Sequence, residues 1–215
     1  MTNPPSQTNS IFGLLRHGET EWNTKKRIQG FNNSPLTAKG IIQTKEWAKT
    51  LQQWQWDQIY ASDLGRVKQT AAILNQSLQL PTFFDKRLRE QNWGDWEGLT
   101  IPVIKKDYNQ ELKKRVALGW EFSAPGGETR SSVLDRVFEA LQSICKNHPG
   151  KKTLIICHHG VIKAILYHLS NRQFHPEEDP LIQHNNFHII SCTQNNFNIE
   201  RLNISRQHAT IGKNG

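Results

Sequence analysis

The chain has 215 residues, a length that suits one domain, or one domain with a small insertion, and that can bury a substantial core. Its 27 Lys and Arg exceed its 19 Asp and Glu, which gives a formal net charge of +8. No apolar stretch approaches the length of a membrane span, and the polar residues 1–10 lack the apolar centre of a secretory signal, so we expect a cytoplasmic protein with no membrane partner.

The first half of the chain alternates between predicted strands and helices. A short apolar run without polar alternation is typical of a strand buried on both faces, and apolar residues spaced three to four apart are typical of a helix. The pattern predicts a strand over 11–15, a helix over 37–54, a strand over 59–61, a helix capped at Ser62 and Asp63 that runs to about Leu74, and a weak strand over 82–84.

Residues 99–125 interrupt this alternation. The segment contains Pro102, basic clusters at 105–106 and 113–115, and a Pro-Gly-Gly turn that starts at Pro125. It has no obvious helix caps. We expect it to form a short lid insertion above the carboxyl edge of the sheet, open enough to admit water.

The second half of the chain returns to the alternating pattern. It predicts a helix over 128–146, a strand over 154–157, a helix over 161–169, and an edge hairpin formed by 187–192 and 197–202. Strands separated by helices predict an α/β fold with three layers and a mostly parallel, doubly wound sheet. We expect a single domain over 11–204, with a flexible leader at 1–10 and a flexible tail at 205–215.

The basic excess favours an anionic partner, which could be nucleic acid, a membrane surface or a phosphorylated metabolite. The sequence has no zinc-finger spacing and no RNA-recognition aromatic motif, so we expect no nucleic-acid partner. Cys145, Cys157 and Cys192 are widely spaced and form no metal-ligand or CxxC grouping, which predicts reduced thiols and no metal site. Either a monomer or a homodimer fits these observations.

Two of the predicted buried strands end in histidine and glycine. The sequence Arg-His-Gly at 16–18 follows the first strand, and His-His-Gly at 158–160 follows the strand over 154–157. A lone histidine here would more commonly be a satisfied core residue, but two parallel strands would deliver their imidazoles to the same edge, where open α/β sheets bind ligands. A neutral imidazole can attack phosphorus, and the planar guanidinium of Arg16 can pair with two phosphate oxygens.

Arg66 lies in the first turn of the helix predicted after Ser62 and Asp63. The helix dipole disfavours a cation at that end. A solvated surface arginine is one explanation, and an anion bound between Arg66 and the helix N-terminus is the other.

Several blocks of the chain, taken in order, resemble the histidine phosphatase superfamily, the phosphoglycerate mutase-like proteins. They are RHGETEWN at 16–23, SDLGRVKQTA at 62–71, LREQNWGDWEG at 88–98 and the His-His-Gly block at 158–160. The third block and the short lid resemble the alpha-ribazole and broad-specificity phosphatase branch. The resemblance extends from Ile11 to Leu202.

The resemblance implies a role for each matching residue. His17 would accept the phosphoryl group, Arg16 and Arg66 would bind it, Asn23 would donate to a phosphate oxygen, and Glu90 would act as general acid and base. We expect the nearby carboxylates of Asp95 and Glu97 to be structural, either as caps or through pairing with arginine.

Two neighbouring residues, His158 and His159, are candidates for the second catalytic histidine. In the family, the second catalytic histidine is followed by two small or polar residues, then two mostly apolar residues and often an Arg. Lys163 stands at the position of that Arg if His158 is the catalytic histidine, whereas counted from His159 it comes one residue too early. His159 then stands where the family usually has Gly or Gln, and we place it in the substrate pocket, while Lys163 replaces an Arg. Gln29 and Gly30 match a substrate-lining pair.

The resemblance implies a two-step phosphoryl transfer through phosphohistidine, with no metal, nucleotide or other cofactor. We expect a metal-independent phosphomonoesterase that hydrolyses small phosphorylated metabolites and releases inorganic phosphate. A cofactor-dependent phosphoglycerate mutase is the first alternative, although such mutases usually carry a longer insertion. A non-catalytic phospholigand-binding module is the second, although binding alone requires neither a nucleophile nor a proton donor.

Overall fold

The computed structural model describes residues 8–206, so residues 1–7 of the predicted leader and residues 207–215 of the predicted tail lie outside the described part of the chain. Strand β1 (Ser10–Arg16) begins one residue before its expected start. Near the other end, Arg206 forms an ion pair with Glu46, with Nη1 and Oε2 2.7 Å apart.

The sheet has six strands in the order β3-β2-β4-β1-β5-β6. The pairs β1–β4, β2–β4 and β2–β3 are parallel, whereas β5 runs antiparallel to β1 and forms the predicted hairpin with the edge strand β6. After β1, the strands are β2 (Gln58–Ala61), β3 (Thr82–Phe84), β4 (Lys152–Cys157), β5 (Phe187–Thr193) and β6 (Asn196–Ile204). The mostly parallel α/β sheet is therefore as predicted.

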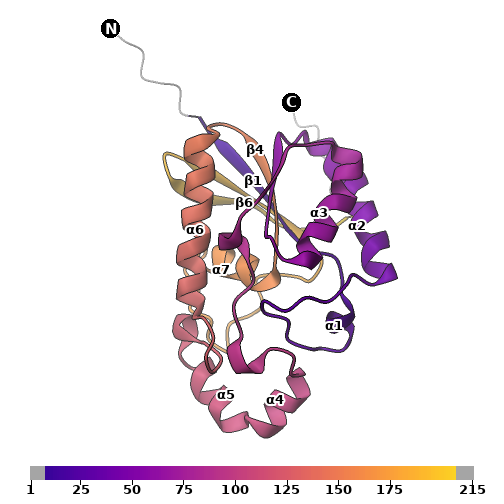
Figure 1. The fold of residues 1–215 in the computed structure, drawn as a ribbon. Coiled ribbons are helices and arrows are strands. Elements are labelled where there is room, and N and C mark those ends of the chain that lie inside the picture. Colours follow the sequence, from indigo (N-terminus) through magenta and orange to yellow (C-terminus); the bar gives the residue numbers. More distant parts are fainter. Residues whose placement is uncertain (1–7, 207–215) are drawn as a thin grey trace.

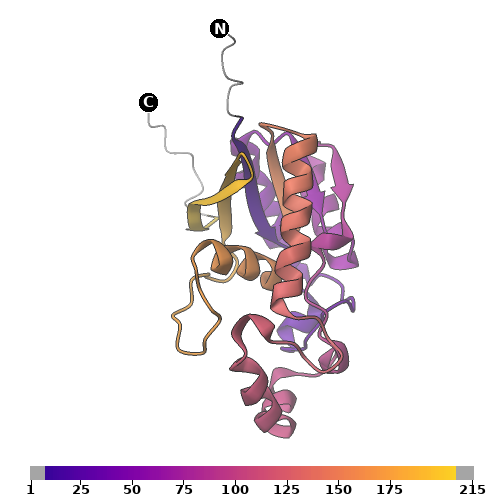
Figure 2. The ribbon, with the colours of Figure 1, turned by 90° about the vertical axis from the view of Figure 1, so that its left-hand side faces the viewer.

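Helices cover both faces of this sheet, which makes the three predicted layers (Figures 1 and 2). The helices α2 and α3 lie on one face, and α6 and α7 lie on the other. The helices are α1 (Glu21–Thr24), α2 (Ala38–Leu51), α3 (Gly65–Leu78), α4 (Ile101–Asp107), α5 (Asn109–Val116), α6 (Arg130–Asn147) and α7 (His159–Leu169), with 3₁₀ turns η1 (Gln52–Trp54), η2 (Lys86–Leu88), η3 (Gly94–Trp96) and η4 (Gly119–Glu121).

The central strand β4 shows why its sequence is apolar without alternation. Leu154 and Ile156 pack into the cluster beneath α2 and α3, whereas Ile155 and Cys157 pack into the cluster beneath α6 and α7. Successive side chains of a strand point to opposite faces, so a strand covered on both faces needs an apolar residue at every position. This burial fixes the position of β4 along the sheet, and with it the position of His158 and His159, which follow the strand.

The start of α3 differs from the prediction. The helix begins at Gly65, and its N-cap residue, Leu64, makes no side-chain capping hydrogen bond. Ser62 and Asp63 do not cap it, because both side chains have other partners: the Ser62 hydroxyl lies 2.9 Å from Nε2 of His158, and Asp63 forms an ion pair with Arg89. The capping assignment was wrong.

The lid insertion is helical, contrary to the expectation that it lacks helix caps. The Thr100 hydroxyl accepts from the backbone N–H of Val103 and caps α4. Together with α5, this helix lies at the end of the molecule opposite the start of β1 (Figure 1). The lid is held by a small apolar core that includes Trp96, Ile104 and Phe122.

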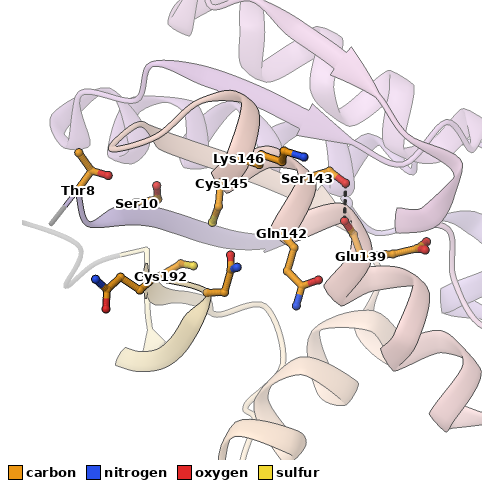
Figure 3. Close-up of a pocket in the computed structure, with 10 residues that line it drawn as sticks. Thr8, Ser10, Glu139, Gln142, Ser143, Cys145, Lys146 and Cys192 are labelled. Carbon is orange, nitrogen blue, oxygen red and sulfur yellow. Dashed lines mark hydrogen bonds between the residues drawn. The ribbon is translucent and has the colours of Figure 1, made fainter. Parts of the chain in front are cut away.

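A hollow of about 620 Å³ lies at the amino end of β1, between α6 and the β5–β6 hairpin (Figure 3). Ser10, Cys145 and Cys192 contribute to its lining. Burial raises the pKa of the Cys145 thiol to about 12, and all three cysteines of the chain are free thiols. Over residues 8–206, no helix has the length and apolar character needed to cross a membrane.

Candidate active site

The histidines that follow β1 and β4 lie next to each other at the carboxyl edge of the sheet. The strand register pairs Arg16 with Cys157, and the backbone N–H of His17 donates to the Cys157 carbonyl over 3.0 Å. The ring centroids of His17 and His158 are 5.3 Å apart. Parallel pairing of two neighbouring strands thus brings both rings to one place.

His17 presents one ring nitrogen with an unshared electron pair. Its Nδ1 lies 2.8 Å from the carbonyl oxygen of Gly18, which only accepts hydrogen bonds, so this arrangement assigns the proton to Nδ1. Nε2 accepts from Nε of Arg66 over 3.3 Å. Burial, together with the charges of Arg16 and Arg66, holds the pKa of His17 well below its usual range. The ring is therefore neutral near pH 7 and is suited to attack through Nε2.

Arg66 contacts both histidines and is only 2% exposed. Its guanidinium donates to the carbonyls of Asn32 over 2.6 Å and Gly30 over 2.8 Å, and Nη2 lies 3.1 Å from Nδ1 of His158. Burial lowers its pKa to about 10, which leaves it charged near pH 7. No carboxylate of the described chain lies within ion-pair distance of this cation. A buried, unneutralised guanidinium near the N-terminus of α3 favours an anion.

Arg16 supplies a second cation at the same edge. Its Nε is buried and has no hydrogen-bond partner among residues 8–206. Burial lowers its pKa, whereas the charges of Glu90 and Glu19 act in the opposite direction. A bound oxyanion would give the buried donor an acceptor, which the protein itself does not provide.

His158 is placed behind Arg66. Its ring is fully buried, with Nδ1 facing Arg66 and Nε2 lying 2.9 Å from the Ser62 hydroxyl. Burial and the charge of Arg66 hold its pKa well below its usual range, so it is neutral. In this arrangement Nδ1 accepts from the arginine, which makes His158 a support for the guanidinium.

Glu90 is fixed at the start of α7. Its Oε2 accepts from the backbone N–H of Gly160 over 3.2 Å, and its Oε1 accepts from that of Gln91 over 2.9 Å. A Cβ atom at Gly160 would overlap the Glu90 carboxylate, so only glycine allows this close approach. The carboxyl group thereby reaches the cavity that also contains His17.

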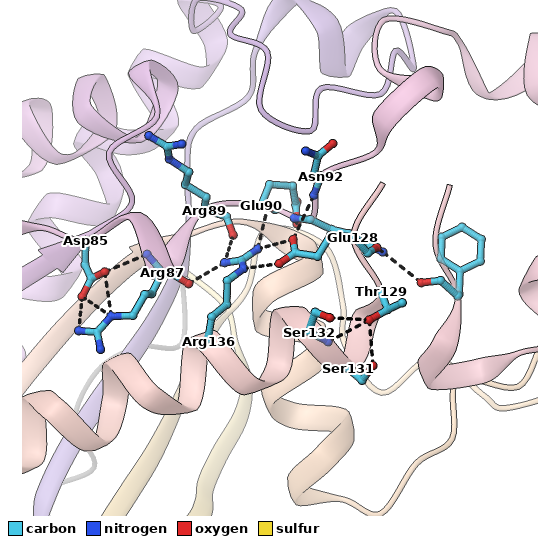
Figure 4. Close-up of polar contacts among 12 residues, drawn as sticks. Asp85, Arg87, Arg89, Glu90, Asn92, Glu128, Thr129, Ser131, Ser132 and Arg136 are labelled. Carbon is cyan, nitrogen blue, oxygen red and sulfur yellow. Dashed lines mark hydrogen bonds and ion pairs between the residues drawn. The ribbon is translucent and has the colours of Figure 1, made fainter. Parts of the chain in front are cut away.

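Arg136 of α6 holds the backbone that carries Glu90 (Figure 4). Its Nη1 donates to the carbonyls of Arg87 over 2.6 Å and Arg89 over 2.7 Å, and its Nη2 donates to that of Glu90 over 3.0 Å. Glu128 neutralises it, with Nε and Oε1 2.7 Å apart. The guanidinium therefore fixes the course of residues 87–90 against α6.

These groups open into a cavity of about 620 Å³. The Lys and Arg side chains among its lining residues are Arg16, Lys26, Arg27, Arg66, Arg130 and Lys163. Glu90 is the one carboxylate among those lining residues. Such an excess of positive charge in a concave site favours an anionic ligand.

The other residues predicted for the site also line this cavity: Asn23, Gln29, Gly30 and His159. The Asn23 Oδ1 accepts from the backbone N–H of Thr20, which leaves its amide N–H groups as donors. Oε1 of Gln29 is buried with no hydrogen-bond partner in the described chain. Burial, above all, lowers the pKa of His159 to about 3, so it lines the cavity as a neutral ring. His158, in contrast, is absent from this lining.

Glu97 has the structural role expected of it, although its partners are not arginines. Its carboxylate accepts from the backbone N–H groups of Phe31 and Trp93 and from the side-chain amide of Asn32. These bonds hold the loop whose carbonyls at positions 30 and 32 accept from Arg66.

Cys157 lies beside the site but is not suited to nucleophilic attack. Burial raises the pKa of its thiol, and the side chain is fully buried in the core. Among residues 8–206, no group of three or more His, Cys, Asp or Glu side chains is arranged to hold a metal ion.

Sequence reasoning missed three contributors to the site. Ser62 was assigned to a helix cap, and nothing in the sequence indicated its contact with His158. Arg130 is the first residue of α6, where the helix dipole disfavours a cation. The same signal that singled out Arg66 could have found it. Phe174 follows no motif and reaches the cavity from a loop.

Comparison with known proteins agrees with this geometry. The profile of the histidine phosphatase superfamily (branch 1) matches residues 12–205. The uncharacterized phosphatase PhoE of Bacillus subtilis is 34% identical over 157 residues, which cover 73% of this chain and 76% of that protein. The probable phosphoglycerate mutase GpmB of Escherichia coli is 38% identical over 153 residues, which cover 71% of each chain.

A solved structure extends the similarity to the fold. The structure of Bacillus stearothermophilus YhfR superposes with a TM-score of 0.83 at 31% sequence identity, and the match covers 93% of this chain and 99% of that one. The family profile spans the strand-end histidines, Arg66 and Glu90. The chain belongs to the histidine phosphatase superfamily.

Proposed function

We propose that this protein is a phosphomonoesterase that hydrolyses small phosphorylated metabolites through a phosphohistidine on His17, without a metal ion. The observation that carries the proposal is the contact between Nε2 of neutral His17 and the buried, unneutralised guanidinium of Arg66. It places a nucleophile and a phosphate-binding cation at the same point of an electropositive cavity.

The first step forms the covalent intermediate. Nε2 of His17 attacks phosphorus, so that a nitrogen–phosphorus bond forms while the bond from phosphorus to the leaving oxygen breaks. Protonated Glu90 gives its proton to that oxygen. Arg16, Arg66 and the amide of Asn23 stabilise the negative charge on the other phosphate oxygens.

The second step releases phosphate. Water attacks the phosphorus, and the Glu90 carboxylate accepts a proton from that water. The nitrogen–phosphorus bond breaks, which restores neutral His17 and yields inorganic phosphate. His158 acts in both steps by holding Arg66 in place.

A phosphoglycerate mutase is the second candidate, because the relative from Escherichia coli carries that name. A mutase must keep its phosphohistidine from water until the second acceptor is oriented. Of the lid residues 99–125, only Ile101 lines the cavity, and its side chain is 45% exposed. This open arrangement favours hydrolysis over transfer to a second substrate.

The proposal also favours a cytoplasmic location, where phosphorylated metabolites occur and free thiols persist. A binding module without activity is disfavoured, because binding phosphate requires no proton donor in the same cavity as the nucleophile. The intact pair of His17 and Glu90 supports an enzyme.

The deciding experiment assays phosphate release from a panel of phosphomonoesters, with and without a chelator, and follows phosphoglycerate interconversion in parallel. We expect hydrolysis that the chelator does not change and that exceeds interconversion. Labelled substrate quenched during turnover should leave acid-labile phosphate on His17. His17→Ala should be folded, unlabelled and inactive, whereas His168→Ala, outside the active-site cavity, should be as active as wild type.

Two results would overturn the proposal. Unimpaired turnover in His17→Ala would exclude the phosphohistidine. Interconversion that is stimulated by 2,3-bisphosphoglycerate and exceeds hydrolysis would make the protein a mutase.

A further inference from the structure

Two cations of the cavity lie away from the strand ends that hold the phosphoryl group. Arg130 is the first residue of α6, and Lys163 lies in α7, four residues after His159. Four residues of helix correspond to a rise of about 6 Å. A neighbouring hollow of about 290 Å³ shares Arg130, Lys163 and Phe174 with the main cavity. The two cations therefore stand where the cavity extends beyond its catalytic end.

Aromatic rings hold both cations in place. The guanidinium carbon of Arg130 lies 4.3 Å from the ring centroid of Phe122 and 4.4 Å from that of Phe174. Nζ of Lys163 lies 4.7 Å from the centroid of Tyr167 and 4.9 Å from that of Phe174. Such contacts orient a cation but leave its charge in place.

Neither cation is neutralised by the protein. No carboxylate in residues 8–206 lies within ion-pair distance of Arg130 or Lys163. Glu178 lies near enough to raise the pKa of Lys163, but neither of its oxygens lies within ion-pair distance of Nζ. Burial lowers the pKa of Arg130 to about 10 and lowers that of Lys163, which is the cost of placing two like charges together away from water.

One bond to the protein fixes the direction of the guanidinium. Nη1 of Arg130 donates to the carbonyl of Gly119 over 2.9 Å, and this is the hydrogen bond that its guanidinium makes with the described chain. The other N–H groups of the guanidinium have no acceptor in the described chain, and the rings of Phe122 and Phe174 position the group beside Lys163. A guanidinium and an ammonium held together in this way match an acidic group.

We propose that Arg130 and Lys163 form a second anion subsite, which binds a carboxylate or a second phosphate of the substrate. The inference rests on the proposed phosphatase activity and specifies its substrate class: small phosphomonoesters that carry a further acidic group. The catalytic end takes the transferred phosphoryl group, and the subsite takes the group that stays with the product.

The test compares substrates that differ only in the second acidic group. One pair is 3-phosphoglycerate and glycerol 3-phosphate, and the other is 1,3-propanediol bisphosphate and 3-hydroxypropyl phosphate. For the wild type, kcat/KM for total phosphoryl transfer should be higher for the doubly acidic member of at least one pair. Lys163→Met keeps the apolar stem over Tyr167 and Phe174 and removes the charge, so this preference should fall roughly tenfold or more.

Two further variants sharpen the result. Lys163→Arg keeps the charge and should retain most of the preference. Lys114→Met removes an exposed lid charge that does not line the cavity and should leave the preference at its wild-type value. Arg130→Gln should lower the preference in the same direction as Lys163→Met.

The outcomes separate the subsite from the activity. If the two variants lose the preference for the doubly acidic substrate in the first pair alone, the subsite binds a carboxylate. If they lose it in the second pair alone, the subsite binds a phosphate, and a loss in both pairs supports a general acidic group. If the wild type hydrolyses these esters without a preference, or if Lys163→Met and Arg130→Gln keep it, the subsite is refuted while the phosphatase stands. If no ester is turned over and His17 is not labelled, the proposed function itself fails.

Discussion

At the residue scale, Arg66 links the two strand-end histidines through opposite ring nitrogens. His17 offers Nε2 to the guanidinium and His158 offers Nδ1, while each ring is fixed by a different partner on its other side. A phosphate oxygen is a stronger acceptor for a guanidinium than a neutral ring nitrogen. A substrate phosphate that takes over the contact with Nε of Arg66 would therefore release the lone pair of His17 for attack.

Glu90→Gln tests the acid role at this scale. A side-chain amide is too weak an acid to protonate the leaving oxygen, so kcat/KM for glycerol 3-phosphate should fall roughly 100-fold or more. 4-Nitrophenyl phosphate has a leaving group that needs little protonation, so its kcat/KM should fall much less. A burst of 4-nitrophenol followed by slow turnover should appear, because hydrolysis of the phosphohistidine needs the carboxylate as base.

The matched control is Glu121→Gln, which removes an exposed lid carboxylate. It should leave kcat/KM for both substrates within about twofold of the wild type. Equal losses on both substrates in Glu90→Gln would show that another group protonates the leaving oxygen.

Sequence reasoning succeeded for residues whose position follows from strand order. The carboxyl ends of parallel strands meet at one edge, so the placement of His17 and His158 could be predicted from two short apolar runs. The supports behind them could not. Ser62 reaches His158 across 96 positions of sequence, and such a contact depends on how β2 packs beside β4.

At the element scale, α6 anchors the segment that carries the general acid. Arg136 donates to the carbonyls of Arg87, Arg89 and Glu90 in that segment and pairs with Glu128. Arg136 does not line the cavity, so it acts through Glu90 and is a positioning residue. The two partners of the pair are 18% and 19% exposed, so solvent screens their interaction only in part.

Arg136→Met should therefore affect both stability and the leaving-group dependence. It leaves the carbonyls at positions 87, 89 and 90 without their donor and Glu128 without its cation, and we expect the free energy of unfolding in urea to fall by about 3 kcal/mol. The displaced Glu90 should lower kcat/KM for glycerol 3-phosphate more than for 4-nitrophenyl phosphate, as in Glu90→Gln.

Arg115→Met is the control for this prediction. Its pair with Glu111 joins residues four apart in the lid helix, with exposures of 26% and 42%. Loss of this pair, together with its bond to the Ser123 carbonyl, should cost no more than about 1 kcal/mol and should leave the ratio of the two kcat/KM values unchanged. An Arg136→Met protein with the wild-type ratio would reduce Arg136 to a purely structural role.

The elements themselves were predictable where an apolar pattern is strong. The strands, the major helices and the hairpin follow from periodicity, since core packing enforces it. The prediction for the lid failed because its helices lack such a strong apolar pattern. Its α5 has eight residues and buries none of them fully, and Leu112 and Val116 are its two apolar side chains. So short and polar a segment does not stand out in the sequence, and it is held by contacts with Trp96 and Phe122, which lie outside the two helices.

At the scale of the whole molecule, the net charge of +8 includes a local excess in the active-site cavity, whose lining has six Lys and Arg side chains and one carboxylate. Carboxylates such as Glu111 and Glu128 are paired with arginines outside the cavity, whereas most cavity cations lack a partner. Unpaired charge of one sign in a concave site raises the local concentration of oppositely charged substrate. The cavity therefore attracts anionic substrates to the end of the sheet where the histidines emerge.

The same fold buries several histidines in neutral form, which makes its stability depend on pH. His188 of β5 is only 1% exposed and does not line the active-site cavity. Its Nδ1 accepts from the backbone N–H of Asn203 over 3.2 Å. Burial lowers its pKa to about 4.

The expected sign follows from proton binding in the two states. An unfolded histidine takes up a proton as the pH falls below about 6.5, whereas folded His188 does so only near its pKa of about 4. The contribution of His188 to the free energy of unfolding is therefore fully present above about pH 6.5, and it declines by about 3 kcal/mol between pH 6.5 and pH 4. His188→Gln should show a correspondingly smaller loss of unfolding free energy in urea over that range. His168→Gln, at an exposed ring, should follow the wild-type curve; equal slopes for wild type and His188→Gln would refute the prediction.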